Sequence, residues 1–89
     1  MSDIPGSVKV EKSAPRILVA EDEALIRLDL VEMLTEAGYT VVAQATNGLE
    51  AIALAREFKP DLAILDVKMP ELDGISAAQE IIEIAPVLM

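Results

Sequence analysis

Short apolar runs alternate with longer amphipathic segments along residues 16–89, and this alternation constrains the fold more than any other feature of the sequence. The apolar runs predict strands at residues 16–20, 39–45 and 62–65, with the start of a fourth at 87–89. The amphipathic segments predict helices at residues 23–38, 49–59 and 75–84. Strands that alternate with helices form βαβ units, whose right-handed crossovers build one parallel sheet with helices on both faces. The sequence therefore predicts a doubly wound α/β domain.

Turn-forming residues mark the ends of these segments. Gly38 is expected to end the first helix, and Asn47-Gly48 is interpreted as a turn without a chemical role before the second. Pro60 and Pro86 are expected to break the chain after the second and third helices. The residues of the first helix that we assign to its apolar face are Ile26, Leu30, Met33, Leu34 and Ala37.

Composition and charge exclude several classes of protein. The chain has 89 residues, a net charge of −9 and no cysteine, so we expect at most one small domain without disulfides. Residues 1–15 mix Pro, Gly, Ser and charge, which predicts a flexible leader before a domain at 16–89. The apolar runs are too short for a membrane span or a signal peptide, so we expect a cytoplasmic protein with no membrane partner. The acidity argues against direct binding of nucleic acid by this segment and suits a cation.

Acidic residues directly follow two of the predicted strands. Glu21, Asp22 and Glu23 come after the first strand, and Asp66 comes after the third. Ligands bind outside the carboxyl ends of the strands in open parallel sheets, so these acids should meet if the two strands are neighbours. Converging carboxylates repel one another and favour a bound cation, and such oxygen ligands suit Mg²⁺. Asp66 is then a candidate nucleophile toward phosphorus, because carboxylates form acyl phosphates in enzymes.

The same acids also have structural interpretations. An acid in the first turn of a helix is stabilised by the helix dipole, and this suits Glu23. Taken alone, Asp66 is also compatible with a turn residue or a helix cap. Asp73 is interpreted as the N-cap of the third helix, because Gly74-Ile75 opens that helix directly after it.

The stretches "ILVAEDE", "NGLEAI" and above all "DLAILDVKMPELDGI" resemble the receiver domain of two-component response regulators, in particular receivers that carry a C-terminal antiterminator-type RNA-binding domain. The resemblance covers residues 16–89 and implies a flavodoxin-like sheet with strand order 2-1-3-4. It implies that Asp66 accepts a phosphoryl group from a sensor histidine kinase, in a switch that is not a turnover enzyme. It further implies that Asp22 and Asp66 bind Mg²⁺ directly, that Glu21 contributes through water, and that the Lys68 backbone carbonyl completes the protein ligands.

The chain departs from the receiver pattern in two places. Glu21 stands where Asp is usual, a change that we expect the site to tolerate. Receivers also continue beyond a stretch such as "PVLM" to a switch Ser or Thr and to a fifth strand with a Lys before a Pro. We therefore expect a receiver that is truncated before the fifth strand of this pattern, counted from the strand at residues 16–20. Its sheet would then have an uncovered face that favours self-association. Lys59-Pro60 cannot replace the missing Lys-Pro pair, because it precedes the third strand.

Three other functions are compatible with parts of the sequence. Haloacid dehalogenase-like phosphatases also end a strand on an aspartate nucleophile, but they place a second Asp two residues later, where this chain has Lys68. A dinucleotide-binding domain is disfavoured because "VAEDEALIR" has acids in place of a glycine-rich phosphate loop. An inert interaction module with the same fold remains an alternative.

Overall fold

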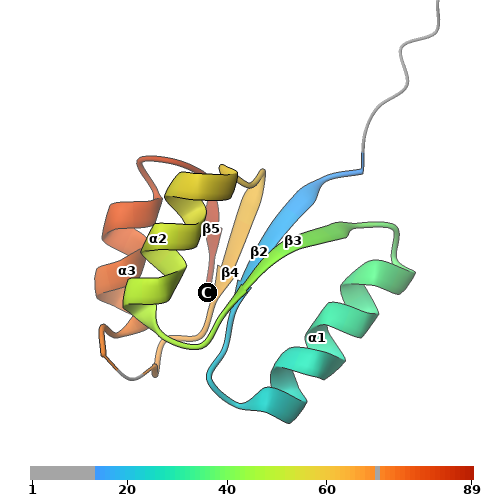
Figure 1. Ribbon diagram of the computed structural model, residues 1–89, viewed down its shortest axis with the longest axis horizontal. Helices are drawn as coiled ribbons and strands as arrows, with labels where there is room; N and C mark the ends of the chain where they lie inside the picture. The colour runs from blue at the N-terminus through green and yellow to red at the C-terminus, as the bar shows by residue number, and fades with distance from the viewer. Residues whose placement is uncertain (1–13, 70) are drawn as a thin grey trace, which may run out of the picture.

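The computed structural model describes residues 14–69 and 71–89, which form a parallel sheet with helices on both faces (Figure 1). The strands are β2 (Arg16–Ala20), β3 (Thr40–Ala45), β4 (Leu62–Leu65) and β5 (Val87–Leu88). The helices are α1 (Ala24–Glu36), α2 (Gly48–Phe58) and α3 (Gly74–Ile81). Most of the expected leader, residues 1–13, lies outside the described residues.

The four described strands lie in the order β3-β2-β4-β5, and every neighbouring pair is parallel. Counted along the described chain, this is the order 2-1-3-4, so the predicted flavodoxin-like topology is confirmed. The central strand β2 is buried from Ile17 to Ala20, as expected for a strand whose two faces are both covered. Its neighbours are β3 on one side and β4 on the other, an arrangement that decides which loops meet at the carboxyl edge.

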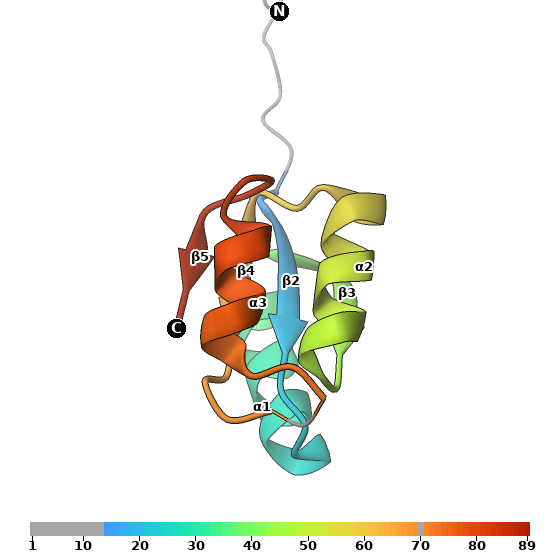
Figure 2. The same cartoon turned by 90° about the vertical axis from the view of Figure 1, so that its left-hand side faces the viewer.

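Helices α2 and α3 cover one face of the sheet, where most of the core lies (Figure 2). Many of the side chains there are small, which lets the two helices approach the strands closely. The buried members of this core are Leu18, Ala20, Ala43, Ala45, Ala51, Ile52, Ala55, Ala63, Leu65, Met69, Ala77 and Ile81. The α2 and α3 face is therefore a closely packed layer of alanines with a few large aliphatic residues between them.

Helix α1 lies on the opposite face, against β2 and β3, and the predicted apolar face of this helix is partly wrong. Leu30 and Leu34 are half-buried as expected, but Met33 is 64% exposed and Ile26 and Ala37 are exposed as well. The half-buried residues that we did not predict are Arg27 and Val31. Apolar residues occur on nearly every side of α1, so their spacing does not identify the face that packs on the sheet.

Local hydrogen bonds and backbone conformation mark where the helices begin and end. The Asn47 side chain caps α2 by accepting a bond of 2.8 Å from the Glu50 amide. Helix α2 ends at Phe58, and the next residue, Lys59, is its C-cap and adopts a left-handed conformation with φ of 46° directly before Pro60. Helix α3 ends at Ile81 instead of the predicted residue 84, because the Ile84 amide donates to the Ile81 carbonyl and turns the chain toward β5.

No helix within the described ranges is both long enough and apolar enough to cross a membrane.

Candidate metal centre

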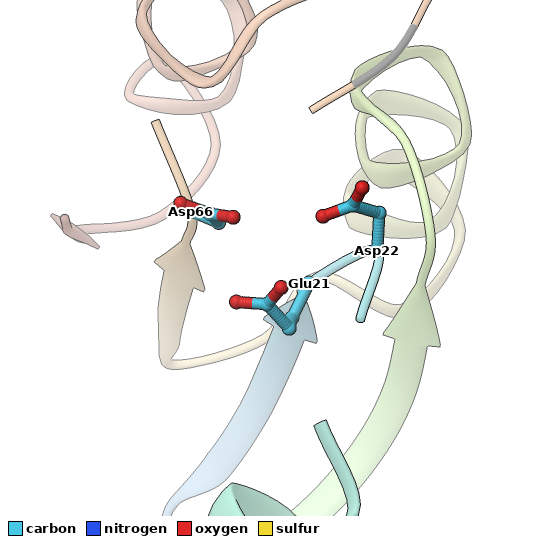
Figure 3. Close-up of side chains that lie close together, drawn as sticks. All are labelled: Glu21, Asp22 and Asp66. Carbon is cyan, nitrogen blue, oxygen red and sulfur yellow. The ribbon is translucent and has the colours of Figure 1, made fainter. Parts of the chain in front are cut away.

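Three acidic side chains meet at the carboxyl edge of the sheet (Figure 3). Glu21 and Asp22 directly follow β2, and Asp66 directly follows β4. Because β2 and β4 are neighbours, residues far apart in the sequence come together at this edge. Each of the three carboxylates offers an oxygen, and these oxygens all lie within 4.8 Å of one another.

Backbone hydrogen bonds fix the positions of two of these residues. The Glu21 amide donates to the Ala45 carbonyl at 3.0 Å, and the Asp66 amide donates to the Ala20 carbonyl at 3.0 Å. Both bonds continue the pattern of the parallel sheet by one residue beyond its strands. The acids therefore begin where the sheet ends, on backbone that the sheet itself holds in place.

Glu21 is the most buried of the three acids, at 9% exposure. The Glu23 amide donates to Glu21 Oε2 at 3.0 Å and orients the carboxylate. Burial raises the pKa of Glu21 above its usual value; the Glu23 hydrogen bond partly opposes this shift, and the negative charges of Asp66 and Asp22 add to it. The repulsion between converging carboxylates that we expected from the sequence is thus present at Glu21.

Asp66 is half-buried, whereas Asp22 is exposed. The Lys68 amide donates to Asp66 Oδ1 at 3.3 Å, which orients the Asp66 carboxylate from the loop that follows β4. Lys68 itself is exposed, as expected for a solvated side chain. The role of its backbone carbonyl as a metal ligand stays a prediction.

The loop between β4 and α3 is held at its far end. The Asp73 side chain caps α3 by accepting a bond of 2.8 Å from the Ser76 amide, and this bond lowers the pKa of Asp73. The Gly74 amide donates to the Val67 carbonyl at 3.1 Å. A β-carbon at Gly74 would overlap the Asp66 carbonyl oxygen and lie 2.7 Å from Val67 Cα, so this close approach requires glycine. Asp73 is therefore a helix cap, as its position before Gly74 predicted.

The donor set at this edge fits a magnesium ion. All three side chains offer carboxylate oxygens, which are the ligands that Mg²⁺ prefers, and this ion usually takes one or two carboxylates and several waters. A cation among them would also offset the effects of burial and of the neighbouring carboxylates, which together raise the pKa of Glu21. The residues therefore suit a hard divalent cation better than they suit an anion.

One supporting residue, Arg27, was not identified from the sequence. Its Nη1 donates to the Glu21 backbone carbonyl at 2.7 Å and so braces the chain where β2 ends. Its amide donates to the Glu23 carbonyl at 2.9 Å within the first turn of α1. A basic residue four positions after Glu23, on a helix that directly follows the acids, is the signal that could have indicated this contact.

Comparison with protein families gives a match over residues 17–89 to the response regulator receiver domain. The chain is 59% identical over 76 residues to the transcriptional regulatory protein PdtaR of Mycobacterium tuberculosis, a match that covers 83% of this chain and 37% of PdtaR. It is 45% identical over 71 residues to the chemotaxis protein CheY of Thermotoga maritima, covering 80% of this chain and 59% of CheY. The chain thus spans well under two thirds of the length of these relatives.

Solved structures with the same fold include receiver domains. The signal receiver domain of the NarL response regulator from Mycobacterium tuberculosis superposes with a TM-score of 0.81 at 30% identity, covering 85% of this chain and 64% of that one. The response regulator domain of Thermotoga maritima CheB gives a TM-score of 0.77 at 39% identity, covering 83% and 56%. These matches favour neither the phosphatase nor the dinucleotide-binding alternative.

Proposed function

Because this chain belongs to the response regulator receiver domain family, we propose that it accepts a phosphoryl group on Asp66 from a sensor histidine kinase and acts as a phosphorylation-dependent switch. The observation that carries the proposal is the meeting of Glu21, Asp22 and Asp66 at the carboxyl edge of the sheet. A lone acid at a strand end is a common turn residue, whereas three carboxylate oxygens within 4.8 Å of one another support a cation site beside the proposed nucleophile.

Asp22 and Asp66 would bind Mg²⁺ directly in this site, with Glu21 acting through water and the Lys68 backbone carbonyl as a further ligand. The ion would supply positive charge beside the oxygens of the phosphoryl group during transfer. Glu21 is oriented toward this role by the Glu23 amide, and its longer side chain still reaches the other two acids.

Asp66 would be the nucleophile. An oxygen of its carboxylate attacks the phosphorus of a phosphohistidine, and the phosphorus–nitrogen bond breaks with its electron pair returning to the imidazole nitrogen. We assign the attack to Oδ2, because the Lys68 amide engages Oδ1. Water later attacks the same phosphorus and displaces the Asp66 carboxylate, which ends the signal.

This chemistry makes the chain a phosphoacceptor and not a turnover enzyme. It promotes its own phosphorylation and dephosphorylation, and the product of the first step is the modified protein itself. Asp66 directly follows β4, and a change in its charge and size would act on the Lys68 amide that contacts it, in the loop that leads to α3. The signal would therefore leave the site through this loop.

The partners follow from the same proposal. A sensor histidine kinase would donate the phosphoryl group. The resemblance to receivers with an antiterminator-type domain leads us to propose a C-terminal RNA-binding output domain, and the similarity to PdtaR, a transcriptional regulatory protein, agrees with an output in gene expression. The net charge of −9 argues that this segment does not bind nucleic acid directly. We propose a cytoplasmic location on the same grounds.

The domain organisation that we propose is a leader at residues 1–15 and a receiver at residues 16–89. We also propose self-association through apolar surface that the described elements leave uncovered. Leu25 and Leu28 on α1 and Leu88 on β5 are each more than half exposed, and such surface favours association in water.

Incubation of the chain with acetyl phosphate and Mg²⁺ tests the proposed function. A receiver forms an acyl phosphate that is labile to base and hydroxylamine and that accumulates to a limit of one per chain. Steady release of phosphate without accumulation would instead indicate the phosphatase alternative. If Mg²⁺ shifts the Asp22 and Asp66 amide signals but neither acyl phosphate nor free phosphate forms, the result would indicate the inert module.

A metal titration isolates the cation site from the transfer step. Asp22→Asn removes one charged ligand and should weaken Mg²⁺ binding by roughly tenfold or more. Asp29→Asn is the matched control, because it removes the same charge from the exposed surface of α1 and should leave the affinity unchanged. Equal affinities in the two variants would contradict the shared site.

A further inference from the structure

Gly48, the first residue of α2, lies against the loop that follows Asp66. It is buried, and the preceding residue, Asn47, caps the helix. A β-carbon at position 48 would overlap the backbone carbonyl oxygen of Leu72 and would lie 2.8 Å from both the carbonyl carbon and Cβ of Leu72. Nonbonded carbon atoms normally stay about 3.5–4.0 Å apart, so the observed contact excludes any side chain at this position.

Leu72 belongs to the same loop as Lys68, whose amide orients Asp66. The loop is fixed at one end by the bond from the Asp66 amide to Ala20 and at the other by the bond from the Gly74 amide to Val67. Between these ends, the half-buried Leu72 side chain packs on the core and its backbone rests on Gly48. The contact with Gly48 thus reaches the loop from a third element, α2.

Both partners of this contact are held in place by further contacts. Helix α2 is pinned to the sheet by Ala51, Ile52 and Ala55, which are all buried. The Leu72 backbone is followed directly by Asp73, which caps α3, and by Gly74, which touches the Asp66 carbonyl. A side chain at position 48 would therefore displace the loop, and the displacement would pass toward Val67 and Lys68 beside the acids.

We infer that Gly48 is a positioning residue for the acidic site, because the absence of a side chain there lets α2 hold Leu72, and through Asp73 and Gly74 the Val67 backbone beside Asp66. This inference rests on the proposed function, since the loop also carries the Lys68 carbonyl that we assign to Mg²⁺. It also revises the interpretation of Asn47-Gly48 as a turn without a chemical role. Gly48 touches neither the metal ligands nor the phosphoryl group, and it acts through Leu72.

Gly48→Ala tests the inference, and Gly38→Ala is its matched control. Gly38 has φ of +98° and no atom within 4 Å of an added β-carbon, so its substitution strains the backbone without pressing on any neighbour. Both variants are expected to lose stability, but only Gly48→Ala should disturb the loop. Comparison at equal overall stability, set by temperature, separates the local effect from the global one.

The first readout needs no metal. Hydrogen exchange at the Gly74 amide reports the bond to the Val67 carbonyl, which is part of the loop. Gly48→Ala should speed this exchange relative to the Asp66 amide, which reports the sheet, whereas Gly38→Ala should change both amides alike. Unchanged relative protection of Gly74 in Gly48→Ala would overturn the inference.

The second readout is Mg²⁺ affinity, followed through the Lys68 and Asp66 amide signals. Gly48→Ala should weaken binding by roughly tenfold, as expected when a residue that supports a ligand loop is changed. Leu72→Ala provides a second variant if Gly48→Ala does not fold, because it removes the packing that holds the same loop and should weaken binding in the same direction. Parent-like affinity in a folded Gly48→Ala, or in Leu72→Ala when the first does not fold, would contradict the inference, whereas a parent chain that binds no Mg²⁺ would instead contradict the proposed function.

Discussion

The two faces of the sheet are packed very differently. On the face of α2 and α3, buried side chains from both helices interlock with those of the strands, and several alanines there have no exposed surface. On the other face, α1 buries none of its residues completely, and Leu25 is 76% exposed. Figure 1 shows the reason, because two helices share one face while α1 alone lies on the other, beside β2 and β3.

One face therefore contributes most of the stability, and the other face leaves apolar surface exposed to solvent. The α2 and α3 face supplies most of the buried apolar surface, which is the main favourable contribution to folding. It also carries the contact between α2 and the loop after Asp66. The α1 face contributes less to stability and offers apolar surface for association. Stability therefore depends mainly on the α2 and α3 face, which we propose also supports the acidic site, whereas the self-association that we propose would use the α1 face.

The largest expected effect is on the free energy of unfolding. Ile81, the last residue of α3, is fully buried, so Ile81→Ala should lower this free energy by about 2–5 kcal/mol. Leu28 on α1 is 58% exposed, and Leu28→Ala should change it by no more than about 0.5 kcal/mol. Urea unfolding followed by circular dichroism measures both. Similar losses in the two variants would mean that the faces are packed alike.

Substitutions at the helix N-caps should give a smaller difference in stability between the same two faces. Asn47 caps α2 through its side chain, so Asn47→Ala should cost about 1 kcal/mol of stability and Asn47→Asp almost none. Glu23 occupies the N-cap of α1 without a side-chain capping bond, and Glu23→Ala should therefore have little effect. The same unfolding measurements test this pair, and a larger loss for Glu23→Ala than for Asn47→Ala would contradict it.

Self-association should depend on α1 and change stability little. Replacing Leu25 and Leu28 by Gln removes exposed apolar surface and should lower the apparent mass in sedimentation velocity at high protein concentration. Leu49→Gln is the control, because Leu49 is 56% exposed but lies on α2. A parent chain that is monomeric at all concentrations, or an equal response to the control, would show that the α1 face is not the association surface.

The smallest expected effect concerns pH. The Ser76 amide lowers the pKa of Asp73 in the folded chain below the ordinary value of 3.8. The stability that the ionised cap contributes is therefore present above about pH 3.8 and is lost as the pH falls through the lower folded value. Asp73→Asn keeps a capping oxygen but cannot titrate, so its stability should fall less steeply below pH 4. Parallel pH profiles of the two chains would contradict this assignment.

The parallel sheet could be predicted because strands alternate with helices along the chain. The strand order was implied by the resemblance to receiver domains, and this order makes the first and third strands neighbours, so that the acids after them share an edge. Two other features escaped prediction. The packed face of α1 was not predicted correctly, because apolar residues surround that helix. The contact of Gly48 with Leu72 was not predicted either, because it joins the start of α2 to a distant loop and depends on the absence of a side chain at position 48. Sequence periodicity describes side chains and carries little information on such backbone contacts.

The location of the phosphoryl group tests the central claim most directly. After incubation with acetyl phosphate and Mg²⁺, borohydride reduction and mass spectrometry should place the modification on Asp66 alone. Asp66→Asn should abolish labelling, and Asp73→Asn should leave it intact because Asp73 caps α3 and lies outside the cluster of Glu21, Asp22 and Asp66. Labelling that persists in Asp66→Asn, or that maps to Asp73 in the parent chain, would contradict the account.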